Sequence, residues 1–306
     1  MRNHLFLAAA LAAVSFGSCK EQPVSISQNE KGKDTTYVTT PETPQSKKYM
    51  VEELSGVICV NCPEGSEMLH NFNASGAFKD KLVIASIHAG TLTKPISGKA
   101  VNSQQDFRTD IGETILTNIF GGDPGKPCAS FDRLPIGAGT PPNNIMGYKS
   151  DWEVMLEKAR TTATSVPVNI AITSEYDSES DAYEIAVKVS YTQALEGRQA
   201  LCLYLLENGI KDAQQYPEAP EYRETEFEHL FRTSLTSYNG LEILPDVSTK
   251  EAGRVLIQNF SLKIDHSDAK QALWKPENME LAAFVYKLGV PTDKRVYQAA
   301  NAPLQQ

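Results

Sequence analysis

One short stretch of the sequence carries the main signal for the fold. Residues 52–63 read Glu-Glu-Leu-Ser-Gly-Val-Ile-Cys-Val-Asn-Cys-Pro. Strand-like residues 49–54 lead into this stretch, and residues 64–79 behind it carry apolar side chains at helical spacing. The next apolar run, 82–87, is nearly continuous and β-branched, which is typical of a strand buried on both faces of a parallel sheet. We therefore predict a strand, a Cys-x-x-Cys, a helix and a second strand, the βαβ context in which this motif is redox-active.

The spacing of the two cysteines has a chemical reason. A thiolate is the nucleophile in disulfide exchange, and the positive end of a helix dipole beside Cys59 lowers the pKa of its thiol. Cys62 lies one turn further on, where it can resolve a mixed disulfide. Two other interpretations stay open, a structural disulfide and half of a zinc site. Zinc needs four ligands, and the sequence shows no second Cys-x-x-Cys or paired histidines, so we predict no metal.

Residues 52–63 resemble the active-site stretch of the thioredoxin fold. The resemblance implies that Glu53, six residues before Cys59, is a buried acid that assists deprotonation of Cys62. The alternative is an exposed strand residue. Residues 125–132 resemble the Gly-x-Pro turn of the same fold, which implies that Pro127 is cis and faces the cysteines. In this fold, residues 152–163 would form the closing helix.

Two further residues are candidate neighbours of the site. His88 ends the second predicted strand, at the sheet edge where open α/β folds place their sites; a surface histidine is the alternative. Cys128 directly follows Pro127 and could act as a third thiol. Its alternative is a small residue that begins a buried strand with its sulfur facing away. Cys202, in an apolar run, is predicted to be a buried structural thiol.

The N-terminus is predicted to be a secretion signal followed by a lipidation site. Residues 1–18 contain Arg2, a twelve-residue apolar run and two small residues, which is the layout of a bacterial secretory signal. Cys19 follows and resembles the lipidated cysteine of a lipobox; a cleaved signal with a coincidental cysteine is the alternative. Lipid on Cys19 would anchor the chain in a membrane. Residues 19–48 are polar and are predicted to be a disordered tether.

The remaining chain divides into two predicted domains, 49–164 and 165–306. In the second, residues alternate apolar and polar around an Asp/Ser-rich turn at 177–181, which predicts a hairpin. Further strands are expected at 199–206, 254–264 and 281–288. This number of half-buried strands suggests an immunoglobulin-like β-sandwich whose default role is binding or dimerisation, including a homodimer. We also predict a helix over 104–119 and a loop over 222–238.

Charge and hydropathy exclude some classes of partner. The formal net charge is −9 and no basic tract is present, so nucleic acid is an unsuitable partner. No apolar run reaches the roughly 20 residues that a spanning helix needs. No cofactor-binding motif was found, and no cofactor is predicted.

Together, the lipoprotein signal, the thioredoxin-like α/β domain and the β-rich domain resemble an outer-membrane lipoprotein family of Gram-negative bacteria. Its members are regarded as surface receptor or adhesion proteins. The leading hypothesis is a thiol–disulfide oxidoreductase that acts on protein thiols or disulfides outside the cytoplasm. The alternative is a non-enzymatic receptor or adhesion lipoprotein for a surface ligand, with the thioredoxin fold as scaffold. Both place the chain at the outer membrane, facing the periplasm or the cell surface.

Overall fold

The computed structural model describes residues 26–27, 34–136 and 144–305. Three α-helices occur there: α1 Cys62–Ala74, α2 Asp110–Asn118 and α3 Trp152–Thr162. Three short 3₁₀-helices occur at Gly76–Phe78, Lys149–Asp151 and Pro276–Asn278. The strands are β1 Ile26–Ser27, β2 Thr35–Val38, β3 Tyr49–Ser55, β4 Leu82–His88, β5 Cys128–Phe131, β6 Gly147–Tyr148, β7 Val168–Asp177, β8 Ala182–Tyr191, β9 Leu195–Glu196, β10 Arg198–Glu207, β11 Ile210–Gln215, β12 Tyr222–Phe227, β13 Leu230–Ser234, β14 Leu241–Glu242, β15 Thr249–Lys250, β16 Arg254–Leu262, β17 Met279–Leu288 and β18 Val296–Pro303.

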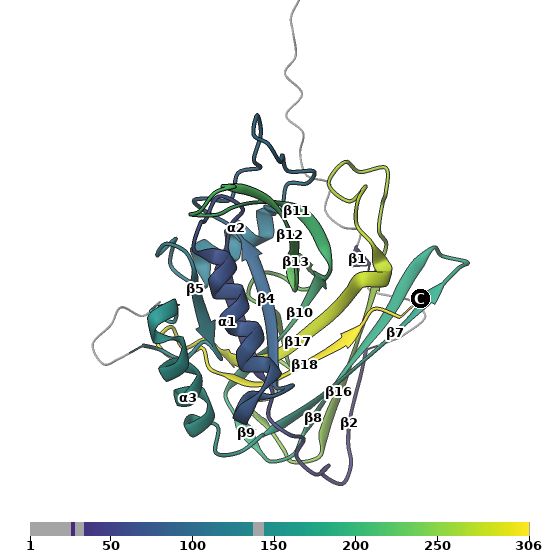
Figure 1. Ribbon diagram of the computed structural model, residues 1–306. Coiled ribbons are helices and arrows are strands. Elements are labelled where there is room, and N and C mark those ends of the chain that lie inside the picture. Colours follow the sequence, from purple (N-terminus) through teal and green to yellow (C-terminus); the bar gives the residue numbers. More distant parts are fainter. Residues whose placement is uncertain (1–25, 28–33, 137–143, 306) are drawn as a thin grey trace, which may run out of the picture.

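The larger sheet has nine strands, in the order β18-β17-β10-β13-β4-β3-β5-β6, with β14 paired to β10. Its N-terminal part is the predicted strand–helix–strand unit, because β3 and β4 are parallel and α1 connects them. β5 runs antiparallel to β3, and β6 antiparallel to β5. Helices α1 and α3 cover one face of this part of the sheet, and the C-terminal strands lie across the other (Figure 1).

Side-chain alternation along β3 separates the two faces. Tyr49 and Val51 pack with apolar residues of α1 and α3, whereas Met50 and Leu54 pack with apolar residues of β10 and β17. Successive residues of a strand point to opposite faces. The adjacent carboxylates of Glu52 and Glu53 therefore enter different environments, and both side chains are buried.

The second sheet, in the order β1-β16-β8-β7 with β2 also on β16, faces the C-terminal strands of the first. Apolar side chains of β7, β8 and β16 share one core with those of β10 and β17. The C-terminal half is thus β-rich, as predicted. It is not a self-contained immunoglobulin-like sandwich, because β13 pairs in parallel with β4 at Leu230 and Ser86. The larger sheet therefore crosses the predicted boundary between residues 164 and 165.

A buried ion pair joins the two parts of the larger sheet. Arg133 donates two hydrogen bonds to Glu52, 2.8 Å from Nε and 2.7 Å from Nη2, and both side chains are fully enclosed. The Tyr204 hydroxyl of β10 donates to the same carboxylate at 3.0 Å. The guanidinium also lies 4.8 Å and 4.7 Å from the ring centroids of Phe284 and Tyr286 on β17. Residues from β3, β10 and β17 are thereby fixed around one charge pair.

The prediction of a disordered tether up to residue 48 is wrong for residues 34–48. β2 pairs with β16, and Asp34 accepts hydrogen bonds from Gln258 and Asn259. Lys47 forms a buried ion pair with Asp132 at 2.7 Å. Composition did not reveal this docking, because pairing with a strand edge uses backbone groups and needs no apolar side chains. The predicted signal 1–18 and Cys19 lie outside the described residues.

Two other predicted segments differ from the structure. The helix expected over 104–119 begins only at Asp110, because Thr109 is an N-cap whose side chain accepts from the Gly112 backbone N–H. The loop expected over 222–238 contains β12 and β13. The strands expected at 199–206, 254–264 and 281–288 and the closing helix at 152–163 are present, with ends shifted by a few residues. Within the described residues, no helix is long and apolar enough to cross a membrane.

We predict that Arg133→Met destabilises the protein by about 3–5 kcal/mol, because it leaves the Glu52 carboxylate buried without its partner. The double substitution Glu52→Leu/Arg133→Met should recover much of this loss. Urea unfolding of Arg133→Met and of the double variant measures the loss of stability and its recovery. Arg160→Met, which removes an exposed pair with Glu157, is the control and should unfold nearly as the unsubstituted protein does. Equal stability of Arg133→Met and this control would contradict the role given to the buried pair.

Candidate functional site

The two motif cysteines form a disulfide at the start of α1. The Cα atoms of Cys59 and Cys62 are 5.4 Å apart, and α1 begins at Cys62 with Pro63 in its first turn. Only 2% of Cys59 and 1% of Cys62 is exposed. Among the described residues, no group of three or more His, Cys, Asp and Glu side chains could hold a metal ion. The arrangement places the disulfide at the positive end of a helix dipole.

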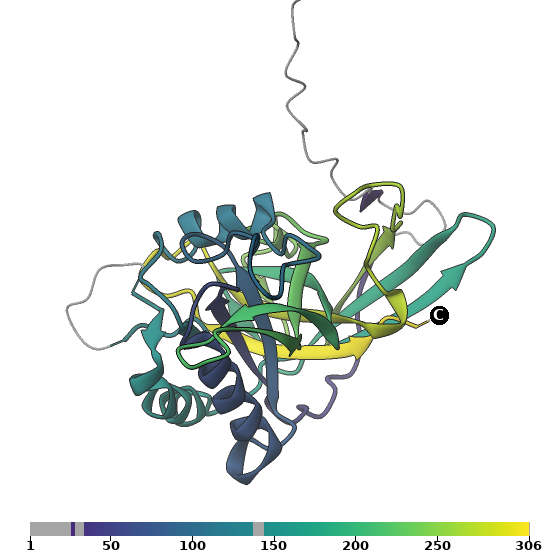
Figure 2. The ribbon, with the colours of Figure 1, turned by 45° about the horizontal axis from the view of Figure 1, so that its top comes forward.

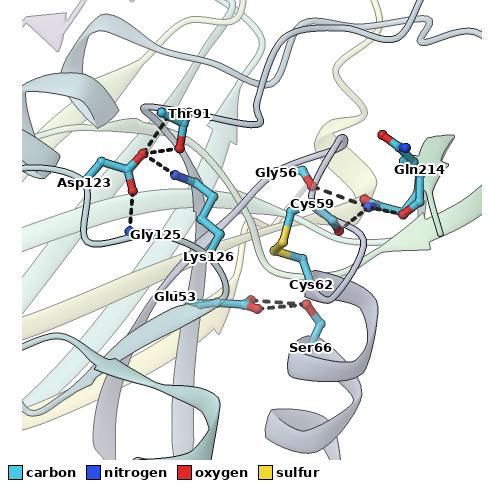
Figure 3. The surroundings of a disulfide bond; sticks show 11 residues. Glu53, Gly56, Cys59, Cys62, Ser66, Thr91, Asp123, Gly125, Lys126 and Gln214 are labelled. Carbon is cyan, nitrogen blue, oxygen red and sulfur yellow. Dashed lines mark hydrogen bonds and ion pairs between the residues drawn. A yellow bond between two sulfur atoms is a disulfide. The ribbon is translucent and has the colours of Figure 1, made fainter. Parts of the chain in front are cut away.

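Glu53 lies beneath this disulfide and is buried, so the exposed-strand interpretation is wrong. Figure 3 shows its carboxylate facing Ser66 on α1, whose hydroxyl donates to both oxygens at 3.0 and 3.3 Å. Burial raises the pKa of Glu53 to about 7, although hydrogen bonds from Ser66 and Ser86 oppose the shift. Near neutral pH the carboxyl can therefore either hold or accept a proton.

The turn before β5, which contains Pro127, packs against α1 at Gly65. The Lys126–Pro127 peptide bond is cis, as predicted. A Cβ atom added to Gly65 of α1 would lie 3.0 Å from the Pro127 ring, so this glycine permits the close approach of the turn to the helix. Lys126 is enclosed and forms a 2.9 Å ion pair with Asp123. Burial alone would raise the pKa of Asp123, but hydrogen bonds from Lys126, Thr91 and Gly125 bring it to about 2.

A hairpin from the C-terminal half covers the cysteine loop. The Gln214 side chain on β11 donates to the carbonyl oxygens of Cys59 at 3.0 Å and of Gly56 at 3.4 Å. The Gln215 backbone N–H donates to the Val57 carbonyl oxygen at 2.8 Å. Sequence reasoning missed these residues, because residues 210–227 carry no chemical motif and the contacts span more than 150 positions.

His88 is buried rather than on the surface. Its ring packs edge-on against Phe107 and Phe227, with centroids 5.3 and 5.8 Å away. Neither ring nitrogen has a hydrogen-bond partner among the described residues. Burial lowers its pKa to about 3, helped by the charges of Lys126 and Arg232, so the imidazole is neutral. His88 pairs with Ser55 in the sheet, which places it at the strand ends that carry the cysteine loop.

Neither Cys128 nor Cys202 is poised for disulfide exchange. Cys128 belongs to the core that β3 and β4 share with β10 and β17, on the face away from α1. Cys202 lies in the same core. Burial raises the pKa of each thiol to about 12, which leaves almost no thiolate at neutral pH. These positions favour the structural interpretation of both residues.

A cavity of about 660 Å³ opens beside the disulfide. One wall is the first part of α1, the opposite wall is the β11–β12 hairpin, and the floor includes Glu53 and Ser86. Figure 2 shows the hairpin, in green, next to the N-terminal end of α1. His229 also lines this cavity, and its Nδ1 lies 2.7 Å from a carboxylate oxygen of Glu280.

Comparisons with known proteins point to the outer membrane. A family model described as "Outer membrane protein Omp28" matches residues 125–302. No curated protein matches the chain. Among solved structures, HBP35 of Porphyromonas gingivalis is 15% identical, with a TM-score of 0.58 over 88% of this chain and 77% of that one. A penta-heme cytochrome c552 from Thermochromatium tepidum, 13% identical over 56% of this chain and 46% of its own, has a TM-score of only 0.22, too low to indicate a shared fold. At 15% identity, the first likeness concerns the fold alone.

We predict that Glu53 makes stability depend on pH. Its carboxyl binds a proton more tightly in the folded state than in the unfolded chain, because its pKa rises from 4.5 to about 7. Between these values the folded state holds more protons, so stability falls as the pH rises. Urea unfolding at pH 4.5 and pH 8 should show that the wild type loses about 3 kcal/mol more than Glu53→Gln. The same loss in both proteins would refute the assignment to Glu53.

Proposed function

The chain belongs to the outer membrane protein Omp28 family, whose model matches more than half of its 306 residues, and we propose that it is a lipoprotein that exchanges thiols and disulfides at Cys59 and Cys62. The outer membrane is thus its location. The lipid anchor on Cys19, the thioredoxin-like unit and the redox reaction are the proposed parts.

Strand order supports a thioredoxin-like unit. Four adjacent strands follow the order β4-β3-β5-β6, with β3 and β4 parallel and the next two pairings antiparallel. α1 and α3 lie on the same face, and the cysteine pair stands where β3 passes into α1. This is the arrangement implied by the resemblance of residues 52–63 and 125–132 to that fold.

The observation that carries the redox proposal is the buried Glu53 carboxyl beneath a disulfide at a helix N-terminus. A substrate thiolate attacks the Cys59 sulfur, and Cys62 leaves as a thiolate that accepts a proton from Glu53. A second substrate thiolate then attacks the mixed disulfide and releases Cys59. The substrate loses two electrons and gains a disulfide, while the cysteine pair gains both electrons.

We predict that the oxidised, unsubstituted protein converts a dithiol peptide to its disulfide in one turnover per protein molecule, and that Cys59→Ser abolishes this turnover. Loss of the Cys59 sulfur removes the atom that forms the mixed disulfide. Peptide oxidation is followed by mass spectrometry, and the reduction potential of the pair is measured by equilibration with glutathione. Cys202→Ser is the matched control and should retain turnover, since that thiol is enclosed in the core. Turnover that survives in Cys59→Ser would rule out this reaction.

Burial of the disulfide favours a second candidate, a surface receptor or adhesion protein in which the bond is fixed. The hairpin bonds to the carbonyl groups of Gly56, Val57 and Cys59 restrict access to the cysteine loop. A reduction potential below roughly −300 mV together with no turnover would favour this candidate. A higher potential with turnover favours the enzyme.

We predict that Cys19→Ala releases the protein from membranes into the soluble fraction. The acyl chains proposed on Cys19 supply the anchoring energy, at about 0.8 kcal/mol per buried methylene. Fractionation of cells that express the variant, with detection by immunoblot, measures the change. Cys128→Ala is the control and should remain in the membrane fraction. Membrane association retained by Cys19→Ala would overturn the proposed lipid anchor.

A further inference from the structure

We propose that the cavity between α1 and the β11–β12 hairpin binds an extended, positively charged peptide segment. The inference rests on the proposed function in one respect: in that reaction, the bound segment carries the substrate cysteine. Three features of the cavity lead to it, namely its position, its charge and the strand edge that borders it.

The position of the cavity places a ligand beside Cys62, one member of the reacting pair. Cys62 and Glu53 line it, so a segment bound there lies next to the disulfide and its buried acid. A volume of about 660 Å³ is within the range of roughly 300–1,000 Å³ that is typical of ligand sites. Both apolar and polar groups line the walls, among them Leu69 and Phe227, so stems of long side chains can pack while their charged ends stay hydrated.

The charge of the walls favours a cation. Exposed carboxylates line both sides of the cavity, with Glu67 on α1 and Glu218, Glu226 and Glu228 on the hairpin side. Within the described part of the chain, no ion pair connects any of these four to a lysine or arginine. Adjacent like charges in a concave wall focus a negative potential on the space between them.

The cations nearest to these carboxylates have other partners. Arg223 donates to the carbonyl oxygens of Glu218 and Pro220, and its guanidinium lies 4.2 Å from the ring centroid of Tyr216. His229 is paired with Glu280. Arg223 and His229 supply some positive charge to the cavity, but the four exposed carboxylates outnumber them, so a ligand cation can pair with the carboxylates that remain.

The hairpin adds a reason for an extended ligand. β11 and β12 form a two-stranded sheet by themselves, so β12 has no strand partner on its outer edge among the described residues. Residues of β12 line the cavity, including Thr225 and Phe227. A peptide that pairs with such an edge gains backbone hydrogen bonds and alternates its side chains between the two walls. Charge complementarity and this edge together select an extended segment with lysine or arginine on either side of its cysteine.

The test measures binding without thiol chemistry. A fluorescent eight-residue peptide of alternating lysine and alanine around a central serine is titrated with the oxidised full-length protein, and anisotropy reports binding at low and high ionic strength. We expect binding at low ionic strength that weakens at high ionic strength. A matched peptide with glutamate in place of lysine should not bind. Equal binding of both peptides, or no binding of either, would overturn the proposal.

Variants locate the site. Glu67→Gln and Glu226→Gln, one on each wall, should each weaken binding of the lysine peptide by about three- to tenfold. Glu153→Gln removes an exposed carboxylate of α3 away from the cavity and should leave the affinity unchanged. Circular dichroism spectra establish that all three variants are folded. Equal affinity in the two wall variants and the control would place the binding elsewhere and refute the cavity assignment.

The outcomes separate this inference from the redox proposal. Because the peptide has serine in place of cysteine, its binding does not require electron transfer. Selective binding of the lysine peptide, with no oxidation of a dithiol peptide by the protein, would support the proposed peptide site and contradict only the proposed redox activity. Conversely, oxidation of lysine-flanked and glutamate-flanked cysteine peptides at equal rates would support the proposed redox activity and contradict the proposed preference of the cavity for cationic peptides.

Discussion

The buried ion pair between Glu52 and Arg133 positions the strands that surround it and, through them, the acid of the candidate site. An unpaired charge cannot remain in this core, so β3, β10 and β17 must meet where the guanidinium can reach its carboxylate and the two rings. Asp132 and Arg133 both adopt a left-handed φ of 51°, which is costly for residues other than glycine. Because β3 alternates, fixing Glu52 toward the C-terminal strands also directs Glu53 toward α1. One structural contact thereby sets the position of the acid under the disulfide.

Local sequence patterns predicted the parts of the site that are close together in the chain. Residues 52–63 predicted the strand, the cysteine pair and the helix, since each depends on neighbours within a few positions. Pro127 was found because a short turn motif surrounds it. The hairpin of β7 and β8 was found because apolar and polar residues alternate on both sides of its turn. In each case the signal and the structure occupy the same short segment.

Contacts between distant segments could not be predicted in this way. Gln214 reaches the carbonyl of Cys59 from 155 positions away, and nothing in its neighbourhood indicates a partner. The continuous sheet depends on the pairing of β13 with β4, and periodicity does not reveal which strands become neighbours. His88 was placed correctly at a strand end, but its burial follows from Phe107 and Phe227, which approach from two other segments.

The pairing of β1 with β16 also limits how far the molecule can stand from a membrane. A free chain from Cys19 to residue 48 could extend about 100 Å, whereas the seven residues from Cys19 to Ile26 reach at most about 25 Å. In the proposed lipoprotein, the end of β16 that holds β1 is therefore kept close to the lipid headgroups. This short connection to the lipid restricts the orientations in which the cavity can bind other molecules of the cell envelope.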